Sequence, residues 1–201
     1  EEWFSGRTPN EIEEYLYGSR ELFWRQETQL MNKKPEVSGY TTTLNCITQK
    51  YPYRDCIESM LDFCEEVIVV DGGSTDGTWQ ELLAMSKLQP KIKPHQVLRD
   101  WQSPRFSVFD GLQKAEARKL CTKEFCWQMD ADERVIQGDG EKILSLCKNW
   151  PQLTELVALP VIEYWGSLDK VRVDVNPWKW RISRNLANIT HGIPKELRRH
   201  D

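Results

Sequence analysis

Two aspartates one residue apart, Asp130 and Asp132, are the side chains of this sequence whose type and spacing best suit chemistry. They follow the mainly apolar run 125–129, which predicts a buried strand that delivers both carboxylates to an open edge of a sheet. Carboxylate oxygens suit Mg²⁺ or Mn²⁺, and such ions keep open positions for phosphate oxygens. The pair is therefore a candidate seat for a metal-bound nucleotide.

A third aspartate, Asp71, ends a second apolar run, 67–70, and begins a turn with the sequence Asp-Gly-Gly-Ser-Thr-Asp-Gly-Thr. Glycines such as Gly73 permit a tight turn and the close approach of a ligand, and a carboxylate at a strand end can accept hydrogen bonds from a base or ribose. The turn matches neither the dinucleotide fingerprint nor a Walker-type phosphate loop. We expect a ligand role for Asp71, and a capping role for Asp76 at the start of the next helix.

The elements that would position these residues alternate between strand and helix. This alternation predicts an α/β fold with a mostly parallel open sheet, flanked by helices, whose ligands bind beyond the carboxyl ends of the strands. The predicted strands are Tyr40–Thr48, Glu66–Asp71, Ile92–Leu98 and the run before Asp130, and the predicted helices are Tyr53–Phe63, Thr78–Lys87 and Ser107–Leu120.

The two ends of the chain follow other patterns. Residues 1–38 are rich in charged and aromatic side chains, and Thr8-Pro9-Asn10-Glu11 has the residue types of a helix start, so we expect a helical appendage to one larger domain, 39–201. After the acidic pair, the pattern predicts a short antiparallel extension. Its elements are a helix over Glu141–Lys148, a strand over Leu156–Tyr164, and short strands over Val171–Val175, Lys179–Ser183 and Ala187–Thr190.

Composition narrows the function classes. A chain of 201 residues with a net charge of -4 indicates neither extensive disorder nor generic nucleic-acid binding. The six cysteines form no Cys-x-x-Cys pair, which favours a reducing compartment such as the cytoplasm. No apolar run approaches the roughly 20 residues that span a bilayer, and no signal peptide opens the sequence. Peripheral membrane contact stays open.

Four segments, in this order and spacing, resemble the family 2 glycosyltransferases, which have the nucleotide-sugar-binding fold called GT-A. The Asp-Ala-Asp-Glu form and the glycine turn look most like the lipopolysaccharide-core branch of that family. The resemblance implies transfer of a sugar from a nucleotide-diphosphate sugar, with a UDP-sugar favoured, to a saccharide, lipid-linked or protein acceptor with inversion. Family members are usually longer, so we expect a fragment or a minimal version. The segments are Cys56–Ser59, Val69–Thr78, Gln113-Lys114 and Asp130–Glu133.

The resemblance also implies roles for single residues. Asp71, with Gly73 beside it, would bind the nucleoside, while Asp132, with help from Asp130 in this Asp-x-Asp motif, would hold Mn²⁺ or Mg²⁺ on the diphosphate. Thr48 lies where the family touches the nucleoside, and Lys114 lies where it often has a basic residue near the donor. A solvent-exposed helical lysine is the alternative for Lys114.

Two further residues complete the predicted site. Glu163, at the end of a predicted strand, is the candidate base that takes the acceptor proton, with Asp169 and Glu196 as substitutes. His191 resembles the histidine of a family His-Glu pair and is a candidate metal ligand, although Gly192 stands where the glutamate is expected. A hydrogen-bonded structural histidine is the alternative with equal weight.

Two other functions remain open at this point. A nucleotidyltransferase shares the sheet and the metal chemistry, but it normally carries a glycine-rich loop where this chain reads Gln49–Tyr53, without glycine. A binding module would keep the nucleotide pocket without turnover. Tryptophans 101, 165, 178 and 180 are expected to pack in the core, with sugar stacking as the alternative, and the basic residues after 194 could attract a lipid headgroup.

Overall fold

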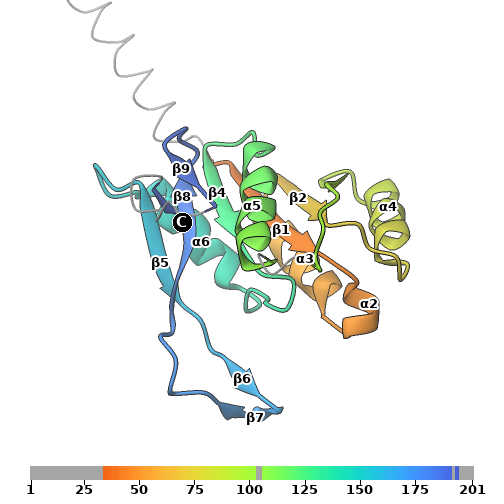
Figure 1. The fold of residues 1–201 in the computed structure, drawn as a ribbon. Coiled ribbons are helices and arrows are strands. Elements are labelled where there is room, and N and C mark those ends of the chain that lie inside the picture. The colour runs from red at the N-terminus through yellow and green to blue at the C-terminus, as the bar shows by residue number, and fades with distance from the viewer. Residues whose placement is uncertain (1–33, 103–105, 192, 195–201) are drawn as a thin grey trace, which may run out of the picture. The chain divides into compact units, whose positions relative to one another are not determined.

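The computed structural model describes residues 34–102, 106–191 and 193–194, and Figure 1 shows their arrangement. Most of the predicted helical appendage, 1–38, lies outside the described residues and stays a prediction. Residues 37 and 38 of that range belong to the first strand, β1 (Val37–Thr43). The basic residues from 195 onward and Glu196 also lie outside the described part.

A six-stranded sheet forms the centre of the described chain. Its strands lie in the order β3-β2-β1-β4-β8-β5; the first four are parallel, and β8 runs antiparallel to both β4 and β5. This arrangement confirms the predicted α/β fold with a mostly parallel sheet and an antiparallel C-terminal extension. The other strand bounds are β2 (Glu66–Asp71), β3 (Ile92–Gln96), β4 (Phe125–Gln128), β5 (Leu156–Pro160) and β8 (Trp178–Arg184).

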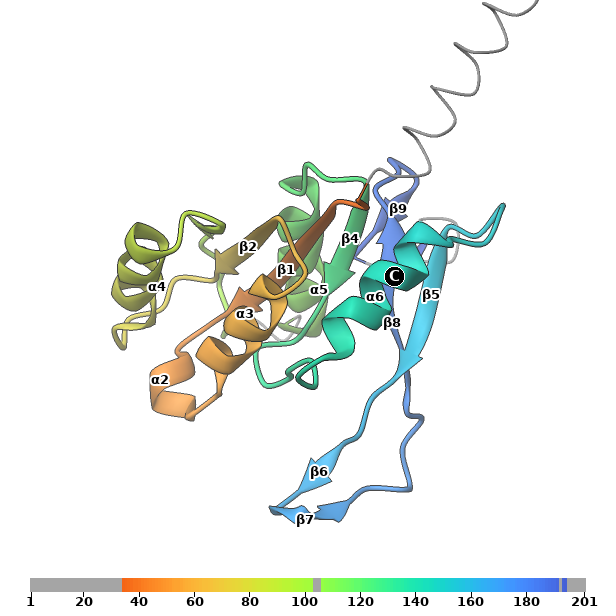
Figure 2. The same ribbon diagram turned by 180° about the vertical axis from the view of Figure 1, so that it is seen from behind.

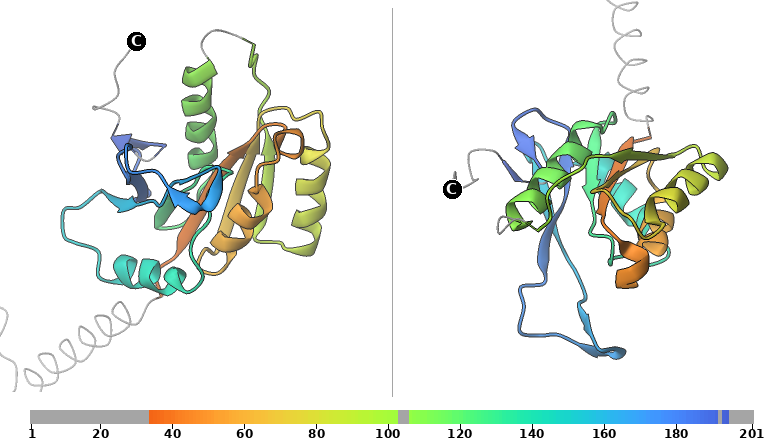
Figure 3. Two further views of the ribbon diagram at one scale, coloured as in Figure 1. Left: turned by 90° about the horizontal axis from the view of Figure 1, so that it is seen from below. Right: turned by 45° about the vertical axis from the view of Figure 1, so that its right-hand side comes forward.

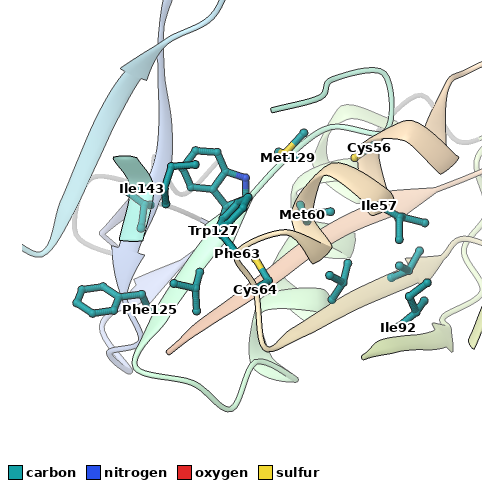
Figure 4. Close-up of a cluster of buried hydrophobic side chains, with 14 of the residues drawn as sticks. Cys56, Ile57, Met60, Phe63, Cys64, Ile92, Phe125, Trp127, Met129 and Ile143 are labelled. Carbon is teal, nitrogen blue, oxygen red and sulfur yellow. The ribbon is translucent and has the colours of Figure 1, made fainter. Parts of the chain in front are cut away.

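Helices cover both faces of the sheet. Side chains alternate along β2, so Val67 and Val69 join one core cluster with α3 and α6, while Ile68 and Val70 join a second cluster with Ala117 of α5. Figure 4 shows the first cluster, in which Phe63 packs edge-on against Trp127 at 5.3 Å between ring centroids. Burial on both faces explains why β2 is continuously apolar. The helices are α2 (Cys46–Gln49), α3 (Tyr53–Leu61), α4 (Thr78–Leu88), α5 (Phe106–Lys119) and α6 (Asp139–Lys148).

The predicted first strand is wrong in its second half. β1 ends at Thr43, and Asn45 then adopts a left-handed backbone (φ 49°) from which α2 begins. The side-chain oxygen of Asn45 accepts a hydrogen bond from the backbone nitrogen of Thr75 at 2.9 Å. The backbone nitrogen of Asn45 donates a second one to Ser74 Oγ at 2.8 Å. A tertiary contact with the turn after β2 therefore overrides the local β-propensity.

The predicted strand Leu156–Tyr164 is divided. β5 ends at Pro160, and β6 (Tyr164–Trp165) and β7 (Ser167–Val171) form a separate two-stranded hairpin that projects from the sheet (Figures 1 and 2). The strand predicted over Val171–Val175 is likewise limited to its first residue. A small antiparallel pair, β9 (Ile189–Thr190) and β10 (Ile193–Pro194), follows β8.

Two properties of the described residues bear on the compartment. All six cysteines are free and buried. In the described part of the chain, no helix combines the length and the apolar composition that crossing a membrane requires.

Candidate functional site

The first component of the site is the turn after β2, which Asp71 holds together. Asp71 is fully buried, and its carboxylate accepts five hydrogen bonds. The donors are Thr43 Oγ1 at 3.1 Å, Gly73 N at 2.9 Å, Ser74 N at 2.8 Å, Ser74 Oγ, and Gln96 Nε2 at 3.1 Å. A carboxylate offers about four lone-pair positions, so the protein itself saturates this one. Asp71 thus ties together the ends of β1, β2 and β3, and a direct bond to a nucleoside would require one of these donors to leave.

The glycines of the turn serve its shape. Gly73 has a φ of 102°, a left-handed conformation that side chains rarely adopt. A Cβ on Gly72 would lie 2.7 Å from the ring of Trp101, whose Nε1 donates a hydrogen bond to the Gly72 carbonyl at 2.8 Å. The indole therefore packs on the turn.

Thr48 lies on α2, five residues beyond β1, and not at the end of that strand as predicted. Its backbone nitrogen donates to Asp76 Oδ2 at 2.8 Å, and Asp76 Oδ1 accepts hydrogen bonds from the nitrogen and hydroxyl of Thr78 at 3.0 and 2.6 Å. Slight burial raises the pKa of Asp76, but these hydrogen bonds outweigh it and lower the pKa to about 2. Asp76 thus joins α2 to the first turn of α4, close to its predicted capping role.

The second component is the segment after β4, where Asp130 is already paired. Its Oδ1 accepts hydrogen bonds from Lys114 Nζ at 2.7 Å and from Gln128 Nε2 at 3.0 Å, and Lys114 also meets Asp110 Oδ2 at 3.0 Å. Burial raises the pKa of Asp130, but the ammonium of Lys114 outweighs it and the net shift is downward. Burial lowers the pKa of Lys114, but the two carboxylates outweigh that effect and raise it. Both partners are therefore charged at neutral pH.

Asp132 differs from Asp130, because it is exposed and makes no hydrogen bond or ion pair with any other residue in the described ranges. It nevertheless lies near the turn after β2. Burial raises the pKa of the Cys46 thiol to about 11, and the carboxylates of Asp71, Asp76 and Asp132 add to the shift. Carboxylates from two segments, the turn after β2 and the segment after β4, thus act on one thiol. The structure therefore brings the free carboxylate to the same edge of the sheet as Asp71.

A largely buried triad beside the Asp130–Glu133 segment was not assigned any role from the sequence. Arg181 Nη1 donates to Gln128 Oε1 at 2.6 Å, Arg181 Nη2 pairs with Glu133 Oε1, and Glu133 Oε2 accepts the backbone N–H of Asp130 at 3.1 Å. Burial raises the pKa of Glu133 and exceeds the opposing effect of Arg181. A charged residue inside the otherwise apolar middle of β8 was the available signal.

A β-bulge directs the side chain of Arg181 toward Gln128 and Glu133. On β8, Ile182 is paired with Val157 and Trp180 with Ala158, so Arg181 is an extra residue without an opposite partner. Bulges of this kind redirect a side chain and are frequent next to functional sites. The triad therefore fixes the backbone that carries Asp130.

The carboxylate oxygens at this edge suit a cation that takes most of its ligands from a bound phosphate compound. Among the described residues, no group of three or more His, Cys, Asp or Glu side chains could hold a metal ion. Mg²⁺ in nucleotide sites commonly uses one or two carboxylates together with substrate phosphates, and Mn²⁺ accepts the same oxygen ligands. Asp132 and the second oxygen of Asp130 would supply such a pair.

The structure does not bring His191, the other candidate metal ligand, to the acidic pair. β8 runs antiparallel to β4 and ends at Arg184 beside Phe125, the first residue of β4. The Ile189 carbonyl then accepts a hydrogen bond from Arg118 Nε, near the end of α5, at 3.2 Å. His191 follows at the amino ends of the parallel strands, whereas Asp130 and Asp132 lie at their carboxyl ends.

Glu163 lies in the projecting hairpin. Its Oε1 is paired with Arg172 Nη1 at 3.2 Å, and within the described residues no hydrogen bond or ion pair links it to Asp130 or Asp132. The structure does not bring the predicted base to the acidic pair.

Comparisons with known proteins agree with this architecture. No protein-family model matches the chain. The chain is 33% identical over 101 residues to the lipopolysaccharide core biosynthesis glycosyltransferase LpsC of Rhizobium meliloti (strain 1021), a match that covers 50% of this chain and 34% of LpsC. S. aureus TarS superposes with a TM-score of 0.53 at 19% identity, over 75% of this chain and 28% of TarS. TarS 1–349 in complex with UDP gives a TM-score of 0.53 at 19% identity, over 75% of this chain and 47% of that one.

This chain has the GT-A glycosyltransferase fold. The resemblance to the lipopolysaccharide-core branch is confirmed by the match to LpsC, and the chain spans about a third of the length of that curated relative. Within the GT-A fold, Asp71 and the Asp130–Glu133 segment lie at the carboxyl edge of the parallel strands, where ligands of open α/β sheets bind.

Proposed function

We propose that the chain transfers a sugar from a nucleotide-diphosphate sugar to an acceptor hydroxyl. The observation that carries this proposal is a free, exposed carboxylate, Asp132, beside the charged Lys114–Asp130 pair at the carboxyl edge of the sheet. The name of the relative LpsC supports the reaction class, and the UDP complex of TarS, which shares the fold, favours a UDP-sugar as the donor.

Each part of this edge has a proposed task. Asp132, with the free oxygen of Asp130, would hold Mn²⁺ or Mg²⁺, which when bound neutralises charge on the leaving diphosphate. Lys114 adds a positive charge 2.7 Å from Asp130, on the donor side of the same edge. The Gln128, Arg181 and Glu133 triad keeps the Asp130 backbone in position.

The reaction is a single displacement. The acceptor oxygen forms a bond to the anomeric carbon while the bond from that carbon to the diphosphate oxygen breaks, so the configuration inverts and the nucleoside diphosphate leaves. The proton of the acceptor hydroxyl passes to the solvent at this open edge as the new bond forms. Glu163 is left out of this scheme, because Arg172 holds its carboxylate.

Two further observations support a proposed acceptor class and compartment. The relative is named for lipopolysaccharide core biosynthesis, which supports a saccharide carried on a lipid as the acceptor. The six free, buried cysteines favour a reducing compartment, so we place the reaction in the cytoplasm.

Thermal unfolding with UDP-, GDP-, ADP- and CMP-sugars, with and without Mn²⁺, tests the proposal. A ligand at a hundred times its Kd stabilises the folded state by about 2.7 kcal/mol, so the correct donor should raise Tm, and more so with Mn²⁺. Asp132→Asn should remove the metal-dependent part of that rise. The matched control, Asp62→Asn, changes an exposed aspartate at the end of α3 and should keep it.

Two results would overturn the proposal. If no nucleotide sugar raises Tm under either condition, the edge is not a donor site. If a donor binds but is neither hydrolysed nor transferred to any saccharide acceptor, the chain is a binding module and not an enzyme.

A further inference from the structure

The β6–β7 hairpin has a face whose apolar side chains are half exposed or more within the described part of the chain. Tyr164 and Val171 are cross-strand partners, so their side chains point to the same face. Ile162 and Val173 lie two residues farther along each arm and, by the alternation of side chains, on that face too. The first three are about half exposed and Val173 is 94% exposed.

The opposite face of the hairpin is polar. Arg172 pairs there with Glu163 at 3.2 Å and with Asp174 at 2.9 Å, and its guanidinium carbon lies 5.1 Å from the centre of the Trp165 ring. The Arg172 nitrogen also donates to the Glu163 carbonyl at 2.8 Å, so the pairing of the two arms continues past the short strands. The charged groups of this face thus neutralise one another, and the hairpin is amphipathic.

The tip of the hairpin carries an exposed leucine, Leu168, beside the exposed Asp169 and Lys170, and it lies on the side of the candidate site. Leu168, two residues after the turn at Gly166, is 82% exposed. Figures 1 and 3 show that the hairpin projects past the carboxyl ends of the parallel strands. Asp130 and Asp132 follow the carboxyl end of β4, so a surface that touches the tip would face the open edge of the site.

We propose that this hairpin seats the protein on a lipid surface, with Leu168 and the apolar face within the interfacial layer. This inference rests on the proposed function, because a glycolipid acceptor would present its sugar at that layer. Aliphatic side chains gain free energy among acyl chains, and Tyr and Trp favour the interface between water and lipid. The contact would turn the carboxyl edge toward the acceptor.

The net charge of the hairpin indicates whether the lipid contact is electrostatic or apolar. Residues 161–177 carry two basic side chains against three acidic ones, so an anionic surface would not attract them. The free energy must then come from apolar burial. Binding should therefore need no anionic lipid and should survive high salt.

A second copy of the chain fits this face less well. A stable protein interface takes about 20–30 residues a side, more than the whole hairpin offers. The edge is short and irregular as well, because β6 has two residues and the register shifts between Tyr164 and Trp165. Such an edge is a poor template for strand pairing.

A saccharide also fits the face less well. Ile162, Val171 and Val173 have no flat ring to lie against a sugar. Trp165 has a ring, but it lies on the polar face with Arg172 against one side of it.

Vesicle co-sedimentation of the full chain tests the inference. The probes are phosphatidylcholine vesicles and vesicles that also contain phosphatidylglycerol, each at low and at high salt. Wild type should sediment equally with both, and salt should not release it. The double variant Leu168→Glu/Val173→Glu should bind at least about tenfold more weakly, since two apolar side chains lose their burial.

The matched control is Leu88→Glu/Leu153→Glu, which changes two equally exposed leucines outside the hairpin and should bind like wild type. All variants should keep the wild-type Tm, because the substituted side chains are exposed. The hairpin variant should also keep the response of Tm to the nucleotide sugar.

Four results would overturn the inference. In the first, the wild type binds only anionic vesicles and salt releases it; in the second, the hairpin variant binds vesicles as well as the wild type does. In the third, the wild type is a dimer in solution and the variant is not. In the fourth, the transfer rate of the variant no longer saturates with a soluble saccharide acceptor. The failures of the two proposals are separable. Donor stabilisation without vesicle binding removes only the lipid contact, and hairpin-dependent vesicle binding without any donor response removes only the proposed reaction.

Discussion

Two carboxylates at opposite edges of the parallel sheet, Glu66 and Asp132, are used in opposite ways. At the amino edge, Glu66 begins β2 and is almost fully buried. It accepts hydrogen bonds from Ser38 Oγ at 2.6 Å and from the nitrogen and hydroxyl of Thr122 at 2.7 and 2.8 Å, and it pairs with Lys93. At the carboxyl edge, Asp132 is exposed without such partners among the described residues. A satisfied carboxylate stabilises the fold, whereas an unsatisfied one is available to a ligand.

Arginine residues show the same division. At the amino edge, Arg118 is buried and donates to Ser183 Oγ at 2.8 Å, to the Arg184 carbonyl at 2.8 Å and to the Ile189 carbonyl at 3.2 Å. These contacts join α5 to β8 and β9. Arg181 lies at the β-bulge of β8, outside the regular strand pairing. It instead forms an ion pair with Glu133, next to the two aspartates of the site. The antiparallel strand β8 thus contributes structure at one edge and positioning at the other.

The largest expected effect is a loss of activity without a loss of stability, from a substitution at the carboxyl edge. Asp132→Asn should lower kcat/KM for sugar transfer by about a thousandfold, roughly 4 kcal/mol of transition-state stabilisation, because it removes the free carboxylate beside the diphosphate. The free energy of unfolding should change by less than about 0.5 kcal/mol, since no described contact is lost. Steady-state kinetics and urea unfolding measure the two quantities. A variant that unfolds easily, or transfers sugar at the wild-type rate, would break the comparison.

The next effect concerns the amino edge and stability. Burial raises the pKa of Glu66, but its hydrogen bonds with Lys93, Ser38 and Thr122 outweigh that effect and lower the pKa from 4.5 to about 2. The charged form therefore stabilises the fold above the unfolded pKa of about 4.5 by about 3 kcal/mol, and this contribution is lost as the pH falls through about 2.

Glu66→Gln should thus lower the free energy of unfolding by about 3 kcal/mol at pH 7, and the gap to wild type should close as the pH falls from about 4.5 toward 2. Urea unfolding across that range measures the gap. The neighbour Glu65, paired with Lys91 at 3.8 Å and partly exposed, provides the control, and Glu65→Gln should cost less than about 1 kcal/mol. A loss independent of pH would assign the effect to packing instead of charge.

The sequence predicted the parts of both edges that depend on local pattern. The apolar run before Asp71 predicted β2 to the residue, because a strand buried on both faces is continuously apolar. The second acidic strand end was equally visible. The antiparallel direction of β8 was predicted as well, but its consequence for His191 was not drawn: an antiparallel strand beside β4 carries the residues that follow it to the amino edge.

Contacts between distant residues set the remaining differences. The left-handed Asn45 that starts α2 is held by Thr75, thirty positions later, and no local signal announces that contact. Arg181 reaches Glu133 across 48 positions through a bulge that strand patterns do not predict. Glu163 was expected at a strand end, but β5 stops at Pro160 and leaves it in the hairpin.

The smallest expected effect tests whether the ammonium of Lys114, at the carboxyl edge, contributes to binding of the nucleotide sugar. Lys114→Gln should weaken binding of the nucleotide sugar about tenfold, or roughly 1.4 kcal/mol, because it removes the ammonium beside Asp130. Isothermal titration measures the Kd. Lys119→Gln on the same helix provides the control, since Lys119 is exposed and pairs, within the described ranges, with Glu116 alone, and it should leave the Kd unchanged. Equal Kd values for both variants would make Lys114 a partner of Asp130 in the fold, like the residues around Glu66 at the amino edge.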